Sequence, residues 1–217
     1  MPPVNIDLAR ALVATLPVGL PNLFNPWREA CSDDTELNGP EIRISRLAEH
    51  LDCQPRLILC GEAPGHLGCR SSGVAFTCEE QLLAGAIPRV SRPGGRISTT
   101  SEPLKEQSAR VVWAALYQHR LESDVVLWNA LQAHPHEPGA PFSNRTPSGS
   151  EFQHGKRAIA LLREAYPKAA FVAIGRKAEG LLASAGIKDV YSVRHPARGG
   201  EKLFNTGIAE LAGRLTP

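Results

Sequence analysis

The stretch RLILCGEAPG, residues 56–65, is an apolar run that ends at once in glycine, a carboxylate and a proline–glycine pair. Its first five residues follow Pro55 and are typical of a buried central strand. In open α/β folds, the loops at the carboxyl ends of parallel strands form the edge that binds ligands. The loop 61–65 is therefore predicted to carry function, with Glu62 as its ionisable side chain.

Three further apolar runs are predicted to be strands, at residues 125–128, 170–174 and 190–193. Helical patterns occur between and around them, at residues 7–16, 42–51, 106–117, 148–166, 177–185 and 204–215. Strands that alternate with helices indicate a parallel sheet covered on both faces. The expected fold class is α/β, a three-layer α/β/α sandwich around a four-stranded parallel sheet.

Local signals mark where some helices begin and where loops interrupt them. Thr77 with Glu80 and Ser148 with Glu151 have the spacing of capping boxes, which satisfy unpaired amides at a helix start. Residues 88–103 are rich in Pro, Gly and Ser and indicate a flexible loop. Residues 131–149 hold four prolines and no periodicity, and a loop of that length inside a domain is usually functional.

The chain has 217 residues, which fits one domain. Residues 1–54 are predicted to form a helical segment that wraps around the core, and residues 55–217 to form the core. The formal net charge of +2 does not by itself indicate nucleic-acid binding. Arginines cluster at residues 89–96, and basic residues cluster again at 194–202. Either cluster alone is more typical of a solvated surface.

The five cysteines are odd in number and form no CxxC pair, so neither a disulfide framework nor a zinc site is indicated. Free thiols fit the reducing cytoplasm. No cationic leader with an apolar core and no membrane-spanning run is visible, so we expect a soluble cytoplasmic protein without membrane contacts. His134, His136 and His154 lack a convincing metal geometry, and no metal is expected.

Common catalytic motifs are missing: there is no GxGxxG fingerprint, no P-loop and no GxSxG elbow. The remaining candidates are Glu62, Phe76, Asn129 and His195, which we expect to meet at one edge of the sheet. Three have ordinary structural alternatives, because Phe76 could be a core aromatic, Asn129 a turn residue and Glu62 a surface carboxylate. Together with the neighbouring arginines they indicate a polar, anionic substrate.

These residues resemble the uracil-DNA glycosylase superfamily, and most closely its thermophile-type branch, family four. The resemblance runs from about residue 56 to the C-terminus. It is carried by GEAPG at 61–65, GVAF at 73–76, Asn129, NRTP at 144–147 with Glu151, and HPA at 195–197.

The resemblance implies a monofunctional glycosylase that flips uracil out of single- or double-stranded DNA and hydrolyses its N-glycosidic bond in base excision repair. It implies a monomer that needs no cofactor. The implied catalytic residues are Glu62 and His195. The implied uracil-binding residues are Gly61, Ala63, Pro64, Gly65, Phe76 and Asn129. The implied DNA-binding residues are His66, Arg70, Arg145, Arg194, Arg198 and Lys202.

The chemistry is consistent with this assignment. Cleavage leaves an anionic base, and a donor from His195 to uracil O2 would stabilise that charge. Pro196 restricts the backbone of His195 to an extended conformation. Phe76 would stack on the base, and the amide of Asn129 can donate to O4 and accept from N3–H. Glu62 could orient water or offset positive charge on the sugar.

Two departures from the family pattern leave alternatives open. Family four holds an iron–sulfur cluster on four cysteines, but this chain has only Cys31 near its N-terminus and none in the loop after Asn129, so no cluster is expected. Ala63 stands where classical members carry a catalytic Asp. The alternatives are a glycosylase for hypoxanthine, xanthine or mismatched thymine, and a catalytically silent protein that binds damaged DNA.

Overall fold

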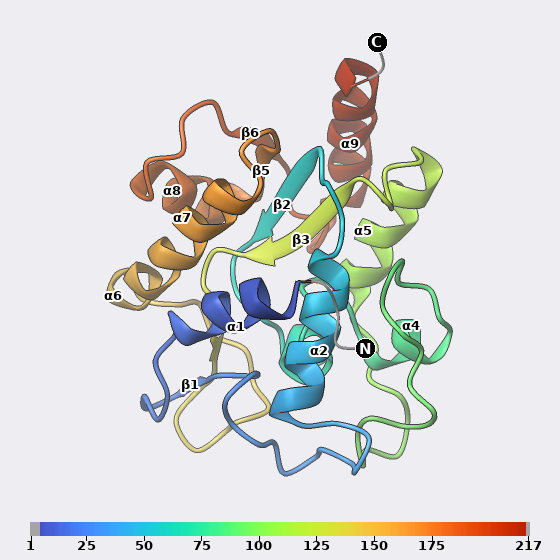
Figure 1. Cartoon of the computed structure of the whole chain (residues 1–217), viewed down its shortest axis with the longest axis vertical. Coiled ribbons are helices and arrows are strands. Elements are labelled where there is room, and N and C mark those ends of the chain that lie inside the picture. Colours follow the sequence, from blue (N-terminus) through green and yellow to red (C-terminus); the bar gives the residue numbers. More distant parts are fainter. Residues whose placement is uncertain (1–4, 216–217) are drawn as a thin grey trace.

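Four parallel strands form the sheet at the centre of the computed structural model, which describes residues 5–215 (Figure 1). Their order across the sheet is β3–β2–β5–β6. The strands are β2 (Leu57–Gly61), β3 (Val125–Asn129), β5 (Ala170–Ile174) and β6 (Tyr191–Val193). Each lies within one residue of its predicted run. β2 and β3 are buried throughout, and such strands are almost entirely apolar.

Alternate side chains of the strands enter two separate cores. In β2, Ile58 and Cys60 face one core, while Leu57 and Leu59 face the other. This follows from the two-residue period of a strand. Helices cover both faces, with α7 and α8 on one side of the strands and α5 and α9 on the other (Figure 1).

The first face is covered by α1 (Ile6–Ala14), α2 (Pro40–Leu51), α7 (Lys156–Ala165) and α8 (Arg176–Ser184). The second is covered by α4 (Glu79–Leu83), α5 (Gln107–Gln118) and α9 (Glu201–Leu215). Short turns connect them: α3 (Cys69–Ser72), α6 (Gly149–Phe152) and the 3-10 turn η1 (Gln153–Gly155). The predicted three-layer α/β/α sandwich is confirmed.

One of the two predicted capping boxes needs correction. Helix α4 begins one residue later than the Thr77–Glu80 spacing predicts, because Gln81 accepts a hydrogen bond from the Cys78 amide at 3.1 Å. Thr77 is buried and instead accepts a hydrogen bond from the Trp113 indole at 3.2 Å. The second predicted capping box, at Ser148, is present at the start of α6.

The long loop after β3 is tied to the N-terminal region. A short strand within it, β4 (His134–Pro135), pairs antiparallel with β1 (Leu23–Phe24). The periodicity of the sequence could not indicate this pair, because each strand contains only two residues. This strand pair anchors residues 131–149 to the N-terminal region.

The predicted wrap, residues 1–54, is held by a buried arginine. The Arg43 guanidinium pairs with Asp34 at 2.6 Å and donates to the carbonyls of Pro26 and Glu29. A fully buried charge needs such partners to offset its desolvation. The predicted domain bounds, 1–217, include residues 1–4 and 216–217, which lie outside the described residues.

A buried carboxylate orders the loop that was predicted to be flexible, residues 88–103. Glu79 accepts hydrogen bonds from the Arg96 side chain and from the amides of Ile97 and Ser98. Although burial acts to raise it, hydrogen bonds from Arg96 and Ser98 lower the pKa of Glu79 to about 2. The loop is irregular in backbone conformation, but its hydrogen bonds to Glu79 fix its position, which corrects the prediction of a flexible loop.

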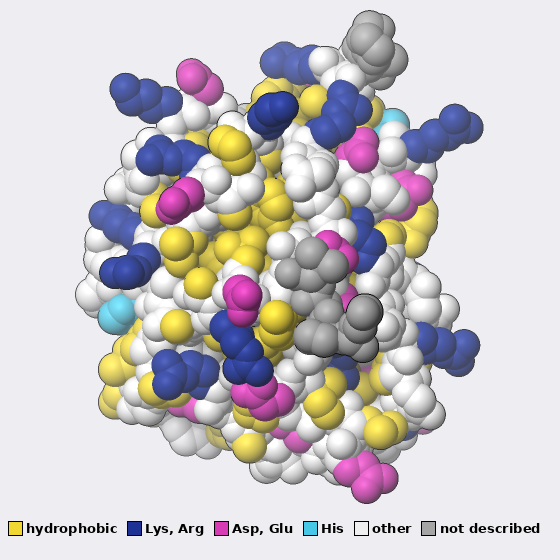
Figure 2. Space-filling model, in the orientation of Figure 1, with side chains coloured by type: hydrophobic (Ala, Val, Ile, Leu, Met, Phe, Trp, Pro, Cys, Tyr) yellow, Lys and Arg dark blue, Asp and Glu magenta, His cyan; other side chains and the backbone are white. Residues whose placement is uncertain are grey.

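Charge is dispersed over the face shown in Figure 2. Lys and Arg side chains are spread across this face with Asp and Glu between them (Figure 2). Such a pattern is typical of a solvated surface. Within residues 5–215, none of the helices combines the length and the apolar character that a bilayer crossing requires.

Candidate active site

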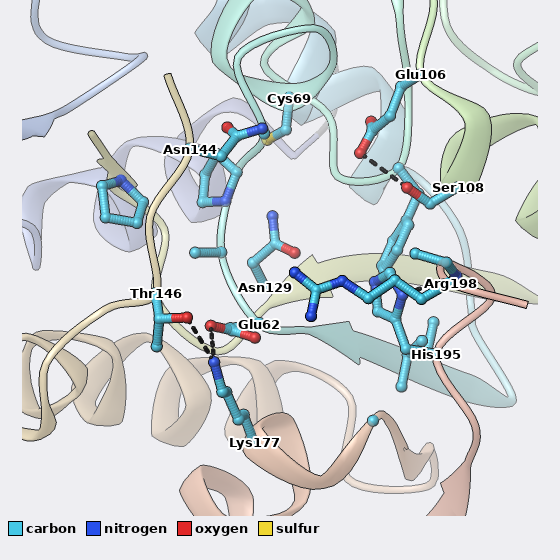
Figure 3. Close-up of a pocket in the computed structure, with 18 of the residues that line it drawn as sticks. Glu62, Cys69, Glu106, Ser108, Asn129, Asn144, Thr146, Lys177, His195 and Arg198 are labelled. Carbon is cyan, nitrogen blue, oxygen red and sulfur yellow. Dashed lines mark hydrogen bonds and ion pairs between the residues drawn. The ribbon is translucent and has the colours of Figure 1, made fainter. Parts of the chain in front are cut away.

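A cleft of about 600 Å³ opens at the carboxyl edge of the sheet. Glu62 follows β2, Asn129 ends β3, Lys177 lies in the first turn of α8 after β5, and His195 follows β6 (Figure 3). All four strands run in the same direction, so their carboxyl ends reach the same edge. The structure thus brings together three candidates from the sequence and adds Lys177.

Phe76 and Asn129 converge over a glycine. A Cβ atom built on Gly61 would lie 2.6 Å from both the Phe76 ring and Asn129 Oδ1. Only glycine at this position lets the ring and the amide approach so closely. Phe76 has a φ of +49°, a left-handed conformation that costs a non-glycine residue energy and is typical of functional sites.

The His195 ring faces the same cleft with one nitrogen already engaged. Its centroid lies 6.2 Å from that of Phe76, and its Nδ1 accepts a hydrogen bond from the Ala197 amide at 3.1 Å. Burial, reinforced by the neighbouring Arg194, lowers the pKa of His195, so the ring is neutral at pH 7. The hydrogen bond to Nδ1 assigns the proton to Nε2, which leaves Nε2–H as a free donor.

A lysine bridges Glu62 to the segment 144–147. Lys177 Nζ lies 3.1 Å from Glu62 Oε1 and donates to Thr146 Oγ1 at 2.7 Å (Figure 3). The backbone of Glu62 is held as well, because its carbonyl accepts from the Leu131 amide at 3.0 Å. The carboxylate is oriented at the mouth of the cleft, with one oxygen occupied by the ammonium group.

The predicted uracil-binding loop lines the cleft beside Asn144. Ala63, Pro64 and Gly65 are all lining residues. Asn144 Oδ1 accepts from the His66 amide at 3.0 Å and lies 3.2 Å from His134 Nε2. This network explains why the long loop after β3 contributes to the site.

Four of the six predicted DNA-binding residues are at least partly exposed, whereas the guanidinium groups of the other two are engaged inside the protein. Arg194 and Arg198 are exposed and line the cleft, where they can reach a phosphate group. His66 is half-buried beside the same loop, and Lys202 is exposed on α9 outside the cleft lining.

Arg70 and Arg145 require correction, because the structure engages both guanidinium groups internally. Arg70 is 3% exposed, and its guanidinium stacks on Phe24 at 4.2 Å and on Phe142 at 4.7 Å. Such cation–π contacts stabilise a desolvated arginine. A buried guanidinium does not reach a DNA phosphate.

Arg145 holds the segment 144–147 in place. It pairs with both oxygens of Glu151, at 2.8 and 2.6 Å, and donates to the carbonyls of His136 and Asn22. The hydrogen bond from Arg145 lowers the pKa of Glu151 to about 2. Its donors are occupied, so it positions the loop that carries Thr146 and is not a DNA contact.

Glu106, just before α5, is a cleft residue that the sequence did not indicate. Ser108 donates a hydrogen bond to its Oε1 at 3.2 Å, while within the described residues 5–215 its buried Oε2 has no partner. Burial raises the pKa of Glu106 to about 7. A carboxyl group that holds its proton near neutral pH at the wall of a cleft is a candidate functional group.

Replacing Glu106 with glutamine is expected to stabilise the protein at pH 8 but not at pH 5. The pKa of Glu106 is about 7 in the folded protein, compared with about 4.5 for an exposed carboxyl group in the unfolded chain. The folded state therefore binds this proton more tightly, and the free energy of unfolding falls as the pH rises from about 4.5 through about 7. We expect a gain on the order of 1–2 kcal/mol at pH 8, or about 2–6 °C in Tm. Thermal unfolding of both variants at the two pH values measures this, with Glu102→Gln as the exposed control. An equal difference at both pH values would contradict it.

The cysteines do not form a cluster site. Cys60 lies within β2, Cys78 precedes α4, and Cys31 accepts a hydrogen bond from Arg70 at 2.8 Å. Across residues 5–215, no group of three or more His, Cys, Asp or Glu side chains is arranged to hold a metal ion. The residues present do not fit an iron–sulfur cluster, and no step of the chemistry is assigned to one.

Comparisons with known proteins agree with this fold. A family model described as the uracil DNA glycosylase superfamily matches residues 48–205, well over half of the chain. No curated protein sequence matches. The crystal structure of wild-type SMUG2 from Pedobacter heparinus is similar, with a TM-score of 0.63 and 13% identity over 95% of this chain and 96% of that chain. At that identity the likeness shows the fold alone. The match to the family model shows that the chain belongs to the uracil DNA glycosylase superfamily and is a DNA glycosylase that acts on DNA.

Proposed function

We propose that the protein removes uracil from DNA by hydrolysis of the N-glycosidic bond, as a monofunctional glycosylase of base excision repair. The observation that carries the proposal is the convergence of Phe76, Asn129 and His195 in one cleft beside Glu62. An aromatic face, an amide and a donor can bind a flipped base by stacking and hydrogen bonds. Hydrolysis of this bond needs water and charge stabilisation, and the proposal includes no cofactor.

The Asn129 amide supports selection of uracil over cytosine. Its NH₂ group donates to uracil O4 while its oxygen accepts from N3–H. Cytosine presents an amino group and an unprotonated N3 at the same positions, so in this orientation of the amide both of its groups are mismatched. Buried mismatches of this kind cost about 1–3 kcal/mol each.

His195 supports departure of the base. As the C1′–N1 bond breaks, its electron pair passes to uracil and negative charge develops at O2. The neutral ring offers Nε2–H to that oxygen, in an orientation held by the Ala197 amide. A donor fixed before the reaction stabilises the developing charge without reorganisation.

Glu62 supports the attack of water on the sugar. Its carboxylate can accept a proton from a water molecule and offset positive charge at C1′. Lys177, which also donates a hydrogen bond to Thr146, holds this carboxylate at the mouth of the cleft. Ala63 also lines the cleft, so the position that carries Asp in classical members contributes no charge here.

The test is incubation of purified protein with labelled oligonucleotides that contain one uracil, followed by alkaline cleavage. Single- and double-stranded substrates, and matched strands with thymine or cytosine, are compared. Strand cleavage at uracil alone supports the proposal. Tight binding of uracil-containing DNA without release of free uracil overturns it in favour of a silent damage-binding protein.

Replacing Lys177 with methionine is expected to lower kcat for uracil excision about 10-fold, because Glu62 loses its orienting partner. Lys177→Arg, which keeps a cation near Glu62, is expected to recover at least part of the rate. Single-turnover rates and DNA affinity are measured separately, with Lys188→Met as the exposed control. A fall in affinity with unchanged kcat would assign Lys177 to DNA binding instead.

A further inference from the structure

The loop 61–68, whose residues 62–65 line the cleft, rests on the carboxyl group of Glu106. A Cβ atom on Gly65 would lie 3.3 Å from Glu106 Oε1, and a Cβ atom on Gly68 would overlap Oε2. Glycine at both positions therefore lets the backbone of the loop pack directly on the two carboxyl oxygens. A change in the charge of Glu106 acts first on this loop.

The two carboxyl oxygens of Glu106 have few hydrogen-bond donors. Oε1 accepts a hydrogen bond from the Ser108 hydroxyl at 3.2 Å (Figure 3), and within residues 5–215 the buried Oε2 has no partner. The Thr77 carbonyl oxygen lies near Oε2, since it is 3.3 Å from the same Cβ position on Gly68. A carbonyl oxygen attracts the hydroxyl of a carboxylic acid and repels a carboxylate, so this position favours the acid form.

Glu79 shows what a buried, ionised carboxylate requires in this protein. Its oxygens accept hydrogen bonds from the Arg96 guanidinium, from the Ser98 hydroxyl and from three backbone amides. Glu106 has one hydroxyl in place of these donors. A carboxylate with so few donors is unfavourable at a buried position unless its surroundings move or admit water.

We propose that Glu106 is a positioning residue for the loop 61–68, and that its neutral acid form holds this loop in the conformation that binds the flipped base. The inference rests on the proposed function, because residues 61–65 form the loop proposed to bind uracil. When Glu106 loses its proton, the negative charge lies against Gly65 and Gly68. Water then enters between the loop and the start of α5, and the loop leaves the position that binds the base.

The surroundings of Glu106 place this change near neutral pH. Burial raises the pKa of Glu106 to about 7, against the opposing effect of the hydrogen bond from Ser108. Burial also raises the pKa of the Cys69 and Cys78 thiols, so both are neutral in this range.

The cation nearest in sequence, Lys105, is paired with Glu80 at 2.9 Å. Further ionisable side chains on the adjacent segments and the cleft lining include those of His66, Arg70, Glu79, Glu102, Arg110 and Arg198. Glu106 therefore changes from mainly acid at pH 6.5 to mainly ionised at pH 8.5.

The experiment measures steady-state excision of uracil from a duplex between pH 6.5 and pH 8.5. For the wild type we expect kcat/KM to fall about 20- to 30-fold, which is the loss of the acid form for a pKa of about 7. The fall is expected mainly in KM, because a bound base favours the acid form and raises the pKa of Glu106 in the complex. The pKa of His195 is lowered, so its ring stays neutral over this range.

Glu106→Gln keeps the size of the side chain and the neutral charge of the acid form. This conservative variant is expected to lose the pH dependence and to exceed the wild-type kcat/KM about 20-fold at pH 8.5. Glu106→Ala removes the support of the loop and is expected to lower kcat/KM about 10-fold at every pH.

Two further variants separate the charge of Glu106 from other effects of pH. Ser108→Ala removes the hydrogen bond that favours the ionised form, so the fall in kcat/KM is expected at higher pH. Glu102→Gln, on the exposed segment before Glu106, is expected to keep the wild-type pH profile.

Hydrogen–deuterium exchange of the peptide that contains residues 61–68 tests the same inference without turnover. At pH 8.5 we expect exchange about fivefold faster in wild type than in Glu106→Gln, and equal exchange at pH 6.5. A pH-dependent fall in kcat/KM that Glu106→Gln shares, or equal exchange at pH 8.5, overturns the role of Glu106 and leaves the proposed function standing. Absence of uracil excision at every pH overturns the proposed function, while the exchange comparison still decides whether Glu106 holds the loop.

Discussion

Replacing His195 with alanine is expected to slow uracil excision by about 100- to 1000-fold, because one preorganised donor to the departing base is lost. The His195 ring approaches Phe76 to 6.2 Å between centroids and receives the Ala197 amide on Nδ1, so Nε2–H is its available donor. Affinity for uracil-containing DNA is expected to change by less than about threefold, because the donor acts mainly on charge that develops in the transition state. Single-turnover excision and equilibrium DNA binding measure the two quantities separately.

His119→Ala is the matched control for this prediction. His119 caps the C-terminus of α5 and is not among the residues that line the cleft. Its replacement is expected to leave the excision rate at the wild-type value. A wild-type rate in His195→Ala would remove His195 from the mechanism, and an equal loss of rate and affinity would make it a binding residue.

Replacing Gly61 with alanine is expected to reduce uracil excision by about 100-fold or more, since displacement of catalytic groups by about 1 Å has effects of this size. The added Cβ would lie 2.6 Å from both Asn129 Oδ1 and the Phe76 ring, so one of them must move. The space for the base is then altered without the loss of any functional group. Overpacking of this kind also costs about 1–3 kcal/mol of stability.

Gly213→Ala is the control for the same chemical change. Gly213 lies in α9, and a Cβ there meets nothing within 4 Å. This variant is expected to retain full activity and to gain up to about 1 kcal/mol of stability, because alanine favours a helix. Tm and excision rate are measured for both variants. Full activity in Gly61→Ala would show that the close approach of Phe76 and Asn129 to Gly61 is not needed for base binding.

The positions of Glu62, Asn129 and His195 could be predicted from the sequence. Each follows an apolar run within two residues, and parallel strands deliver such residues to one edge of the sheet. Lys177 carries the same signal, because it comes three residues after β5 ends at Ile174. The rule that identified the first three residues would have identified Lys177 as well.

Phe76 and Glu106 carry no signal of this kind. Phe76 follows no strand, and its left-handed backbone and its approach to Gly61 depend on segments far apart in the chain. Glu106 precedes α5, which reaches the cleft only because that helix packs on the sheet. A helix pattern shows which face is apolar but not where its first turn lies in space.

The two arginine predictions failed for a related reason. The family resemblance implied that both side chains face DNA, and arginine is rarely buried. Arg70 is enclosed by Phe24 and Phe142, and Arg145 by Glu151 and distant carbonyls. These partners come from segments that only the pairing of β1 with β4 and the folded loop bring together.

The sequence by itself determined the order of strands and helices and the residues placed after each strand, because apolar periodicity and chain direction are local properties. The tertiary structure alone decided which side chains are desolvated and how their pKa values shift: the lowered pKa of His195, the raised pKa of Glu106 and the enclosed guanidinium of Arg70. The burial of a side chain depends on contacts with many segments that are distant in the sequence. No single stretch of the chain can therefore predict it.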